Sequence, residues 1–288
     1  MKRIITVLFL AAACLTAGAQ EFTHHSLKHQ GLDREYYVYV PDSLDSHKPL
    51  VIMLHGYGGK AEGYRPEMAQ TAKKNGFILC VPDGWPSPKT GKRGWNVRYP
   101  KQEGQQSDDV SFVLELTRTL QLAYGIKPEA TFLTGMSNGG EMCYIMAWQH
   151  PEAFRAIASV AGLTMAWLPD ENRLPDAHVP FMEIHGTGDH TSEWTGDPTG
   201  QFGWGEYLSV PLAVGHIASM DKCRYEEVTE LPLLDPEKPS NQVILHRFLG
   251  GTDGCEVRLY EVVGGKHSWH LDDIDTTEEI WDFFRMWL

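Results

Sequence analysis

The feature that most constrains the fold is a serine held between glycines where a strand passes into a helix. Residues 131–134 have the composition of a buried strand, residues 135–139 have the pattern G-x-S-x-G, and a helical stretch follows from Glu141. Glycines on both sides of Ser137 permit a strained turn in which neighbouring backbone passes close by. This order of elements predicts a reactive Ser137. The alternative is a serine–glycine turn without a chemical role.

Further apolar runs of strand length recur along the chain. Leu50–Leu54 is apolar throughout, which is typical of a strand buried on both faces. The other strand candidates are residues 36–40, 77–81, 156–160, 181–184 and 257–263. Helical patterns lie between them, and this alternation is typical of an α/β fold with a mostly parallel central sheet and helices on both faces. We see no internal repeat or linker, so we expect one domain over residues 20–288.

Two of the predicted helices carry clear start signals. The first has Ser107 as its expected N-cap and Gly125 as its stop. The last has an expected capping box of Thr276 and Glu279. Their apolar faces follow helical spacing and comprise Phe112, Val113, Leu116 and Leu120 in the first, and Ile280, Phe283, Phe284 and Trp287 in the last.

A serine hydroxyl is a weak nucleophile without a base, so the chain must also supply a histidine and an acid that orients it. Asp189 lies just past the strand at residues 181–184, where an orienting acid belongs. Asp176 and Asp197 are competing acids, but both lie deeper in loops. His190, beside Asp189, is expected to be a surface or pocket residue.

The base should follow the last strand, at residues 257–263. His267 and His270 both qualify by position, after a turn containing Gly264 and Gly265. Two histidines at this spacing could also bind a metal, but the sequence offers no third ligand, so we expect neither a metal nor a cofactor. The sequence around these histidines does not by itself choose between them.

A tetrahedral intermediate needs two backbone N–H groups directed at its oxyanion. One should come from Asn138, directly after the serine. The other should come from the loop at residues 54–59, where Gly56, Gly58 and Gly59 free the backbone to turn inward. We choose Tyr57 N–H for this second donor, against the alternative of an ordinary glycine turn.

Together these segments resemble the secreted carbohydrate-esterase and polyhydroxybutyrate-depolymerase-like esterases, an α/β-hydrolase family that includes feruloyl and acetylxylan esterases. The resemblance spans most of the chain and implies Ser137, Asp189 and His267 as the triad, favouring His267 over His270. Family members often have proline where His190 and His270 stand, which leaves the substrate open. The motifs that carry it are LHGYGG (54–59), SDDVSFV (107–113), TGMSNGG (134–140), AIASVAG (156–162), IHGTGD (184–189) and GGKHSWH (264–270).

The resemblance implies a serine ester hydrolase that needs no cofactor, with a feruloyl or related ester of plant cell-wall polysaccharide as the leading substrate. Loops at residues 85–106, 165–179 and 191–205 are expected around the site, and their aromatic rings could stack on a sugar or a phenolic ring. The substrate-binding candidates are Trp269, Trp95 and Trp194, with Trp85 and Trp204 as further loop tryptophans. The alternatives are an acetylxylan esterase, a short-polyhydroxyalkanoate depolymerase and, more distantly, a non-catalytic carbohydrate-binding protein.

The first residues have the pattern of an export signal. Lys2 and Arg3 precede a short apolar run, and Ala17-Gly18-Ala19 fits a signal-peptidase site, which predicts a signal peptide over residues 1–19. A lipoprotein anchor at Cys14 is the rival interpretation. We therefore expect a secreted or periplasmic protein without stable membrane insertion.

The net charge limits which classes of partner this protein can bind. The net charge is −13, which repels phosphate backbones and makes nucleic acid a poor partner, whereas an ester-bearing carbohydrate or small ester is compatible. The sequence does not predict the oligomeric state.

Cys80 and Cys143 lie in apolar runs and are expected as buried thiols. Export, together with late cysteine pairs in the resembled esterases, implies a Cys223–Cys255 disulfide.

Overall fold

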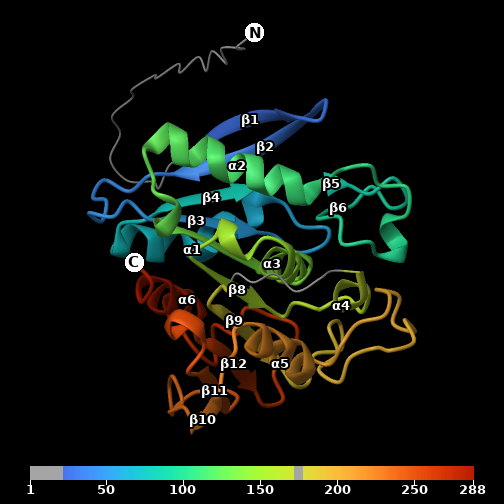
Figure 1. The fold of residues 1–288 in the computed structure, drawn as a ribbon, viewed down its shortest axis with the longest axis vertical. Helices are drawn as coiled ribbons and strands as arrows, with labels where there is room; N and C mark the ends of the chain where they lie inside the picture. Colours follow the sequence, from blue (N-terminus) through green and yellow to red (C-terminus); the bar gives the residue numbers. More distant parts are fainter. Residues whose placement is uncertain (1–21, 172–177) are drawn as a thin grey trace.

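In this computed structural model, residues 22–171 and 178–288 are described, and ten strands among them form one sheet (Figure 1). Across the sheet the strand order is β1-β2-β4-β3-β7-β8-β9-β12-β11-β10. The six middle strands are parallel: β4 (Ile78–Pro82), β3 (Leu50–Leu54), β7 (Thr131–Met136), β8 (Ala156–Val160), β9 (Phe181–Gly186) and β12 (Val257–Val262). This confirms the predicted α/β class, and each predicted middle strand is present with ends shifted by at most two residues.

Antiparallel strands extend the sheet at both edges. On one side β2 (Leu32–Tyr39) pairs with β4, and β1 (Thr23–His29) pairs with β2; on the other, β11 (Val243–Leu249) and β10 (Tyr225–Glu230) follow β12. The sequence predicted only part of β2 and missed β1, β10 and β11. These strands are more polar and less buried than the middle ones, so they lack the continuous apolar run that marked the others.

Helices cover both faces of the sheet (Figure 1). On one face α2 (Asp109–Tyr124) contacts β1 and α3, α3 (Asn138–Gln149) contacts β3, β7 and β8, and α5 (Val210–Met220) contacts β9 and β12. On the other face α1 (Ala61–Asn75) contacts β2 and β4, and α6 (Thr276–Arg285) contacts β8 and β9. None of the described helices is both long enough and apolar enough to span a membrane.

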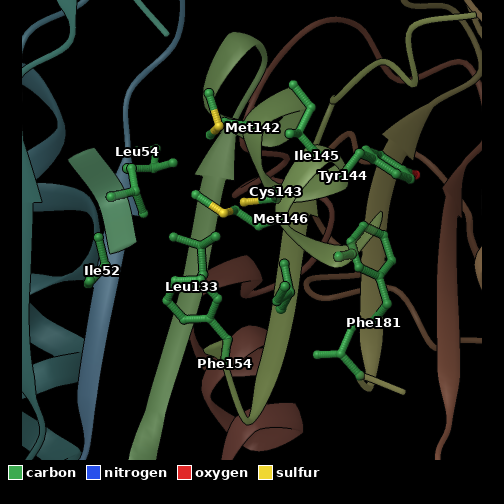
Figure 2. Packing of buried hydrophobic residues seen from close by; sticks show 14 of the residues in the cluster. Ile52, Leu54, Leu133, Met142, Cys143, Tyr144, Ile145, Met146, Phe154 and Phe181 are labelled. Carbon is green, nitrogen blue, oxygen red and sulfur yellow. The ribbon is translucent and has the colours of Figure 1, made fainter. Parts of the chain in front are cut away.

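Helix α3 lies at the centre of one apolar core. Figure 2 shows its side chains packed against strands of the sheet, and all of its residues from Asn138 to Trp148 are buried. The neighbours in this core include Leu54 of β3, Leu133 of β7 and Phe181 of β9. Because α3 begins directly after Ser137, this packing fixes the place of the serine relative to the sheet.

Two predicted helix starts differ from the observed ones by one residue. Asp108, not Ser107, caps α2 by accepting from Ser111 N–H at 3.0 Å, and Asp275, not Thr276, caps α6 by accepting from Glu278 N–H at 3.4 Å. The predicted hydroxyls are bonded elsewhere, because Ser107 Oγ donates to Asp109 Oδ2 and Thr276 Oγ1 donates to Trp269 O, so the neighbouring aspartates cap the helices. The predicted apolar faces are buried, except that Trp287 lies past the end of α6 and is half-buried.

The cysteines are all thiols among the described residues. Cys80 and Cys143 are buried, as predicted, but the expected Cys223–Cys255 disulfide is wrong. The Cys255 thiol donates to Asp221 Oδ2 at 3.1 Å, and the Cys223 thiol lies 3.9 Å from the carbonyl oxygen of Cys255. Each sulfur therefore faces an oxygen partner rather than the other sulfur.

The loops that follow the parallel strands gather at one edge of the sheet. The loop after β4 holds the two-stranded ribbon of β5 (Trp85–Pro86) and β6 (Arg93–Gly94), and the loop after β8 holds the short helix α4 (Trp167–Glu171). In Figure 1 this ribbon, α4 and the loop between β9 and α5 all lie on the right-hand side. In open parallel sheets this edge is where binding sites form.

The docking of α6 gives a stability test. Phe284 is fully buried and stacks on Phe132 of β7 with ring centroids 4.8 Å apart. Phe284→Ala removes a large buried ring and should lower the free energy of unfolding by about 3–5 kcal/mol. Leu122→Ala, at an 85% exposed position of α2, is the matched control and should change it by less than about 0.5 kcal/mol. Urea denaturation followed by tryptophan fluorescence measures both, and similar losses would contradict the packing described.

Candidate active site

Ser137 stands on a sharp turn between β7 and α3. Its φ and ψ are 55° and −121°, a conformation that residues with a side chain rarely adopt, and its N–H donates to Val160 O at 2.8 Å. The turn needs glycine on both sides because backbones meet there. A Cβ on Gly135 would lie 2.5 Å from Gly139, and one on Gly139 would lie 2.3 Å from Leu54 O. The predicted strand–turn–helix arrangement around Ser137 is present.

Asp189 is fully buried in the loop after β9, and each of its carboxylate oxygens is occupied. Oδ1 accepts from the N–H groups of Thr191 at 2.7 Å and Ser192 at 2.8 Å, and Oδ2 accepts from His267 Nδ1 at 2.6 Å. Burial by itself raises the pKa of Asp189, but hydrogen bonds from His267 and Ser192 and the charge of nearby His185 outweigh it and lower the pKa below its usual value. Asp189 therefore stays ionised and holds His267 by its Nδ1.

His267 follows β12 on a loop fastened to the Asp189 loop. Gly188 N–H donates to Gly265 O at 2.9 Å, and Gly264 N–H donates to Thr187 Oγ1 at 2.8 Å. The His267 side chain is 21% exposed, and its Nε2 makes no hydrogen bond to a described residue. The structure records none between His267 and Ser137 either. Such catalytic contacts are often long before substrate binds.

The alternative candidates for the acid and the base have other positions or other hydrogen-bond partners. Asp197 is committed to its own loop, accepting from Thr199 Oγ1 at 3.2 Å and Phe202 N–H at 2.8 Å, and Asp176 lies outside the described residues. His270 is buried, and its Nδ1 lies 3.2 Å from Asp273 Oδ2. His190 is exposed beside Glu193. Among the described residues, no three histidine, cysteine or acidic side chains are grouped as metal ligands would be.

The two predicted oxyanion donors flank the serine. Asn138 is the first residue of α3, so its N–H has no partner within the helix. The loop after β3 lies against the elbow, because a Cβ on Gly56 would be 3.2 Å from Ser137 Cβ. Gly58 N–H and Gly59 N–H bond to Arg93 O and Gly56 O, whereas Tyr57 N–H makes no hydrogen bond to a described residue. Tyr57 is thus an available donor of this loop.

Comparison with known proteins identifies the family of this chain. The model of the Esterase family matches residues 28–198, more than half of the chain. The chain belongs to this esterase family. It is 32% identical over 158 residues to feruloyl esterase B of Thermothelomyces thermophilus, covering 54% of this chain and 52% of that protein. It is 29% identical over 136 residues to an acetylxylan esterase of Coprinopsis cinerea, covering 46% of this chain and 36% of that protein.

The structural superpositions cover more of this chain than the sequence alignments do. An acetyl xylan esterase from Aspergillus awamori superimposes with a TM-score of 0.58 at 16% identity, over 91% of this chain and 99% of that one. A carboxylesterase of Bacillus cereus also reaches 0.58, at 11% identity, over 88% of this chain and 95% of that one. By sequence, the alignments span only about half the length of the two feruloyl esterases matched, 52% and 56%.

Two of the three tryptophans predicted to bind substrate are part of the esterase core. Trp95 is 0% exposed, and its indole N–H donates to His55 O at 2.8 Å. Trp269 is 8% exposed and packs edge-on against Tyr64. Trp95 therefore has no surface open to a ligand in this structure and Trp269 has little, which favours the more exposed loop tryptophans. Trp194 and Trp204 are half-buried and remain candidates.

Sequence reasoning gave no role to His185, although it lies directly behind Asp189. His185 Nε2 is 2.8 Å from Ser192 O and 3.7 Å from Asp189 Oδ2, while Nδ1 is 2.9 Å from Glu183 Oε1. A carbonyl can only accept, so Nε2 carries a hydrogen. Burial alone would lower the pKa of His185, but Glu183 outweighs it and raises that pKa. His185 thus lies between the carboxylates of Glu183 and Asp189, a contact that its place four residues before Asp189 did not by itself predict.

Glu141 is a second buried group that the sequence did not single out. It lies one turn into α3, where its Oε2 accepts from Tyr99 OH and, at 3.1 Å, from Asn138 Nδ2. The Asn138 Oδ1 in turn accepts from Trp95 N–H at 2.7 Å. This network fixes the Asn138 side chain, so the residue after the nucleophile is held by contacts with the loop at residues 85–106.

Glu141 makes stability depend on pH. Burial raises the pKa of Glu141 to about 7 from its usual 4.5, despite the hydrogen bonds from Tyr99 and Asn138. Between these pH values the folded protein keeps a proton that the unfolded chain releases, so the contribution of Glu141 to the free energy of unfolding falls as pH rises through the window. Glu141→Gln should remove this part of the decline, as measured by urea denaturation from about pH 4.5 to 7.5.

Glu129→Gln is the control, because Glu129 is exposed, and it should leave the slope of stability against pH unchanged. A Glu141→Gln protein with the wild-type slope would show that Glu141 is ionised in the folded state throughout this range.

Proposed function

We propose that this protein is a secreted serine carboxylic-ester hydrolase that uses Ser137, His267 and Asp189 as its triad. The observation that carries the proposal is the 2.6 Å contact between His267 Nδ1 and the buried carboxylate of Asp189. The loops after β12 and β9 that form it lie at the same edge of the sheet as the strained turn that presents Ser137 after β7. A nucleophile, a base and an orienting acid at one edge of the sheet are what acyl transfer requires. Membership of the esterase family supports the same activity.

In the proposed reaction, Ser137 Oγ attacks the ester carbonyl carbon while His267 Nε2 takes the hydroxyl proton. The N–H groups of Tyr57 and Asn138 stabilise the oxyanion, and Asp189 stabilises the imidazolium. The C–O bond to the alcohol then breaks, and His267 returns the proton to the leaving alcohol. Water attacks the acyl-enzyme by the same route in reverse, giving the free acid and restoring Ser137.

The substrate we favour is a feruloyl or related acyl ester on plant cell-wall polysaccharide. The two curated relatives matched first are feruloyl esterases, and half-buried Trp194 and Trp204 could hold a flat aromatic acyl group. Acetyl groups on xylan are the second candidate, because other matched relatives and a structural neighbour are acetylxylan esterases. Secretion rests on the signal sequence at residues 1–19, which lies outside the described residues.

The triad predicts how single and double variants behave. Ser137→Ala should lower kcat on any accepted ester by about 10⁴-fold or more, and His267→Ala by a comparable factor. The double variant should be little worse than either, since the residues act as a unit. Asp189→Asn should also be severe, whereas Asp197→Asn should have little effect on turnover. Steady-state kinetics with a chromogenic ester measures these values, and full activity in Ser137→Ala would refute the mechanism.

The substrate proposal predicts a selectivity. Methyl ferulate should show a higher kcat/KM than methyl acetate, because an apolar slot holds a flat ring for attack but places a small acyl group loosely. Trp194→Ala should lower kcat/KM for methyl ferulate about tenfold while changing methyl acetate less. Preference for acetate, or an equal loss on both esters, would replace the feruloyl assignment with the acetylxylan one.

A further inference from the structure

The loop between β4 and α2 has the opposite charge to the rest of the protein. Residues 85–106 contain five basic side chains and one acidic side chain, Glu103, in a chain of net charge −13. A local excess of positive charge on an acidic protein attracts anions to that place. The loop is therefore a candidate surface for binding an anion.

This loop lies directly against the proposed oxyanion donors. Gly58 N–H donates to Arg93 O at 2.7 Å, and Tyr57 OH bonds to Thr90 Oγ1 at 2.6 Å. On its other side, Trp95 N–H donates to Asn138 Oδ1 at 2.7 Å. The basic loop is thus bonded to both residues proposed to hold the oxyanion, and through them it lies beside Ser137.

Three of the five basic residues have other partners. Lys89 pairs with Glu103, Arg93 Nη1 donates to Gly84 O at 3.1 Å, and Arg98 lies over the ring of Trp167 at 4.0 Å. Lys92 and Lys101 have no acidic partner within 4.0 Å among the described residues, and Arg93 has none either. Unlike Arg93, the two lysines make no side-chain hydrogen bond to a described residue, and the Lys101 ammonium lies over the ring of Trp204.

Lys92 and Lys101 each lie next to the oxyanion loop, Lys92 directly and Lys101 through the ring of Trp204. The stem of Lys92 packs over Gly58, with its Cδ 3.5 Å from the position of a Cβ there. Lys101 Nζ lies 3.4 Å from the ring centroid of Trp204, and this ring meets that of Tyr57 at 5.8 Å. Burial, together with repulsion from Lys92, lowers the pKa of Lys101. Two basic side chains therefore border the loop that holds Tyr57.

We propose that Lys92 and Lys101 form an anion subsite that binds a carboxylate of the substrate, of the kind an acidic sugar carries beside the ester. This inference rests on the proposed ester hydrolase function and adds the substrate class. An acidic substrate would be repelled by the net charge of the protein and by the developing oxyanion, and two lysines beside the oxyanion loop offset both effects. Trp204 and Tyr57 add an aromatic surface for the ring that carries the carboxylate.

Binding to the inactive full-length Ser137→Ala protein tests the subsite without depending on turnover. The probes are a xylo-oligosaccharide substituted with glucuronic acid and the unsubstituted oligosaccharide of the same length, titrated by calorimetry. The acidic probe should bind roughly three- to tenfold more tightly at low salt, since partly exposed ion pairs contribute modestly. The preference should approach unity at about 0.5 M NaCl, because salt screens exposed charges.

Matched variants in the Ser137→Ala background show whether the lysines cause the preference. Lys92→Met with Lys101→Met removes both charges but keeps the apolar stems, and it should abolish the preference. Lys101→Arg keeps the charge and should retain it. Lys28→Met removes one charge from exposed β1, at the far edge of the sheet, and should also retain it. Near-ultraviolet circular dichroism checks that each variant is folded.

A kinetic comparison with the wild type finds which side of the ester carries the carboxylate. Monomethyl glutarate hydrolysed with higher kcat/KM than methyl pentanoate would support the subsite and assign it to the acyl side, whereas preference only for the acidic oligosaccharide assigns it to the alcohol side. The inference is overturned if neither pair is discriminated, if neither acidic probe binds or reacts, or if the preference survives the double methionine change. Failure of the proposed function would show separately, as a wild type that hydrolyses no ester.

Discussion

The close approach of two backbones at the start of α3 is the constraint on which the rest of the site depends. Gly139 leaves no room for a side chain against Leu54 O, and Gly135 leaves none against Gly139. This contact holds the turn between β7 and α3 against the loop after β3, so that Gly56, the residue before Tyr57, lies against Ser137. The positive φ of Ser137 is the strain that results, and the buried packing of α3 stabilises it.

The buried carboxylate of Asp189 is stabilised by the same contacts that orient His267. An isolated carboxylate inside a protein is costly, but two backbone N–H groups and His267 together satisfy its oxygens. His185 Nε2 lies 3.7 Å from the same oxygen, Oδ2, that accepts from His267, and His185 is itself held by Glu183. The same contacts that keep the acid ionised also fix the direction of the imidazole, so stability and the proposed catalysis depend on one network.

The loop at residues 85–106 joins several parts of the site that the sequence leaves far apart. Buried Asp109 at the start of α2 accepts from Asn96 N–H at 2.8 Å and pairs with buried Arg34 of β2 at 2.7 Å. Trp95 then ties the loop to His55 and to Asn138. The loop is therefore anchored from below while its exposed residues face outward beside Tyr57. Folding therefore places the basic residues of this loop beside the proposed substrate site.

The sequence by itself determined the middle of the sheet, the turn at Ser137 and the position of Asp189 just past β9, because these depend on local apolar runs and glycine spacing. It could not determine which side chains face each other across the fold. Trp95 and Trp269 are buried, and the sulfurs of Cys223 and Cys255 face oxygens. His267, rather than His270, bonds to Asp189 because the loop after β12 packs against the loop after β9. Burial and pairing between distant segments are set by tertiary packing, which no local pattern encodes.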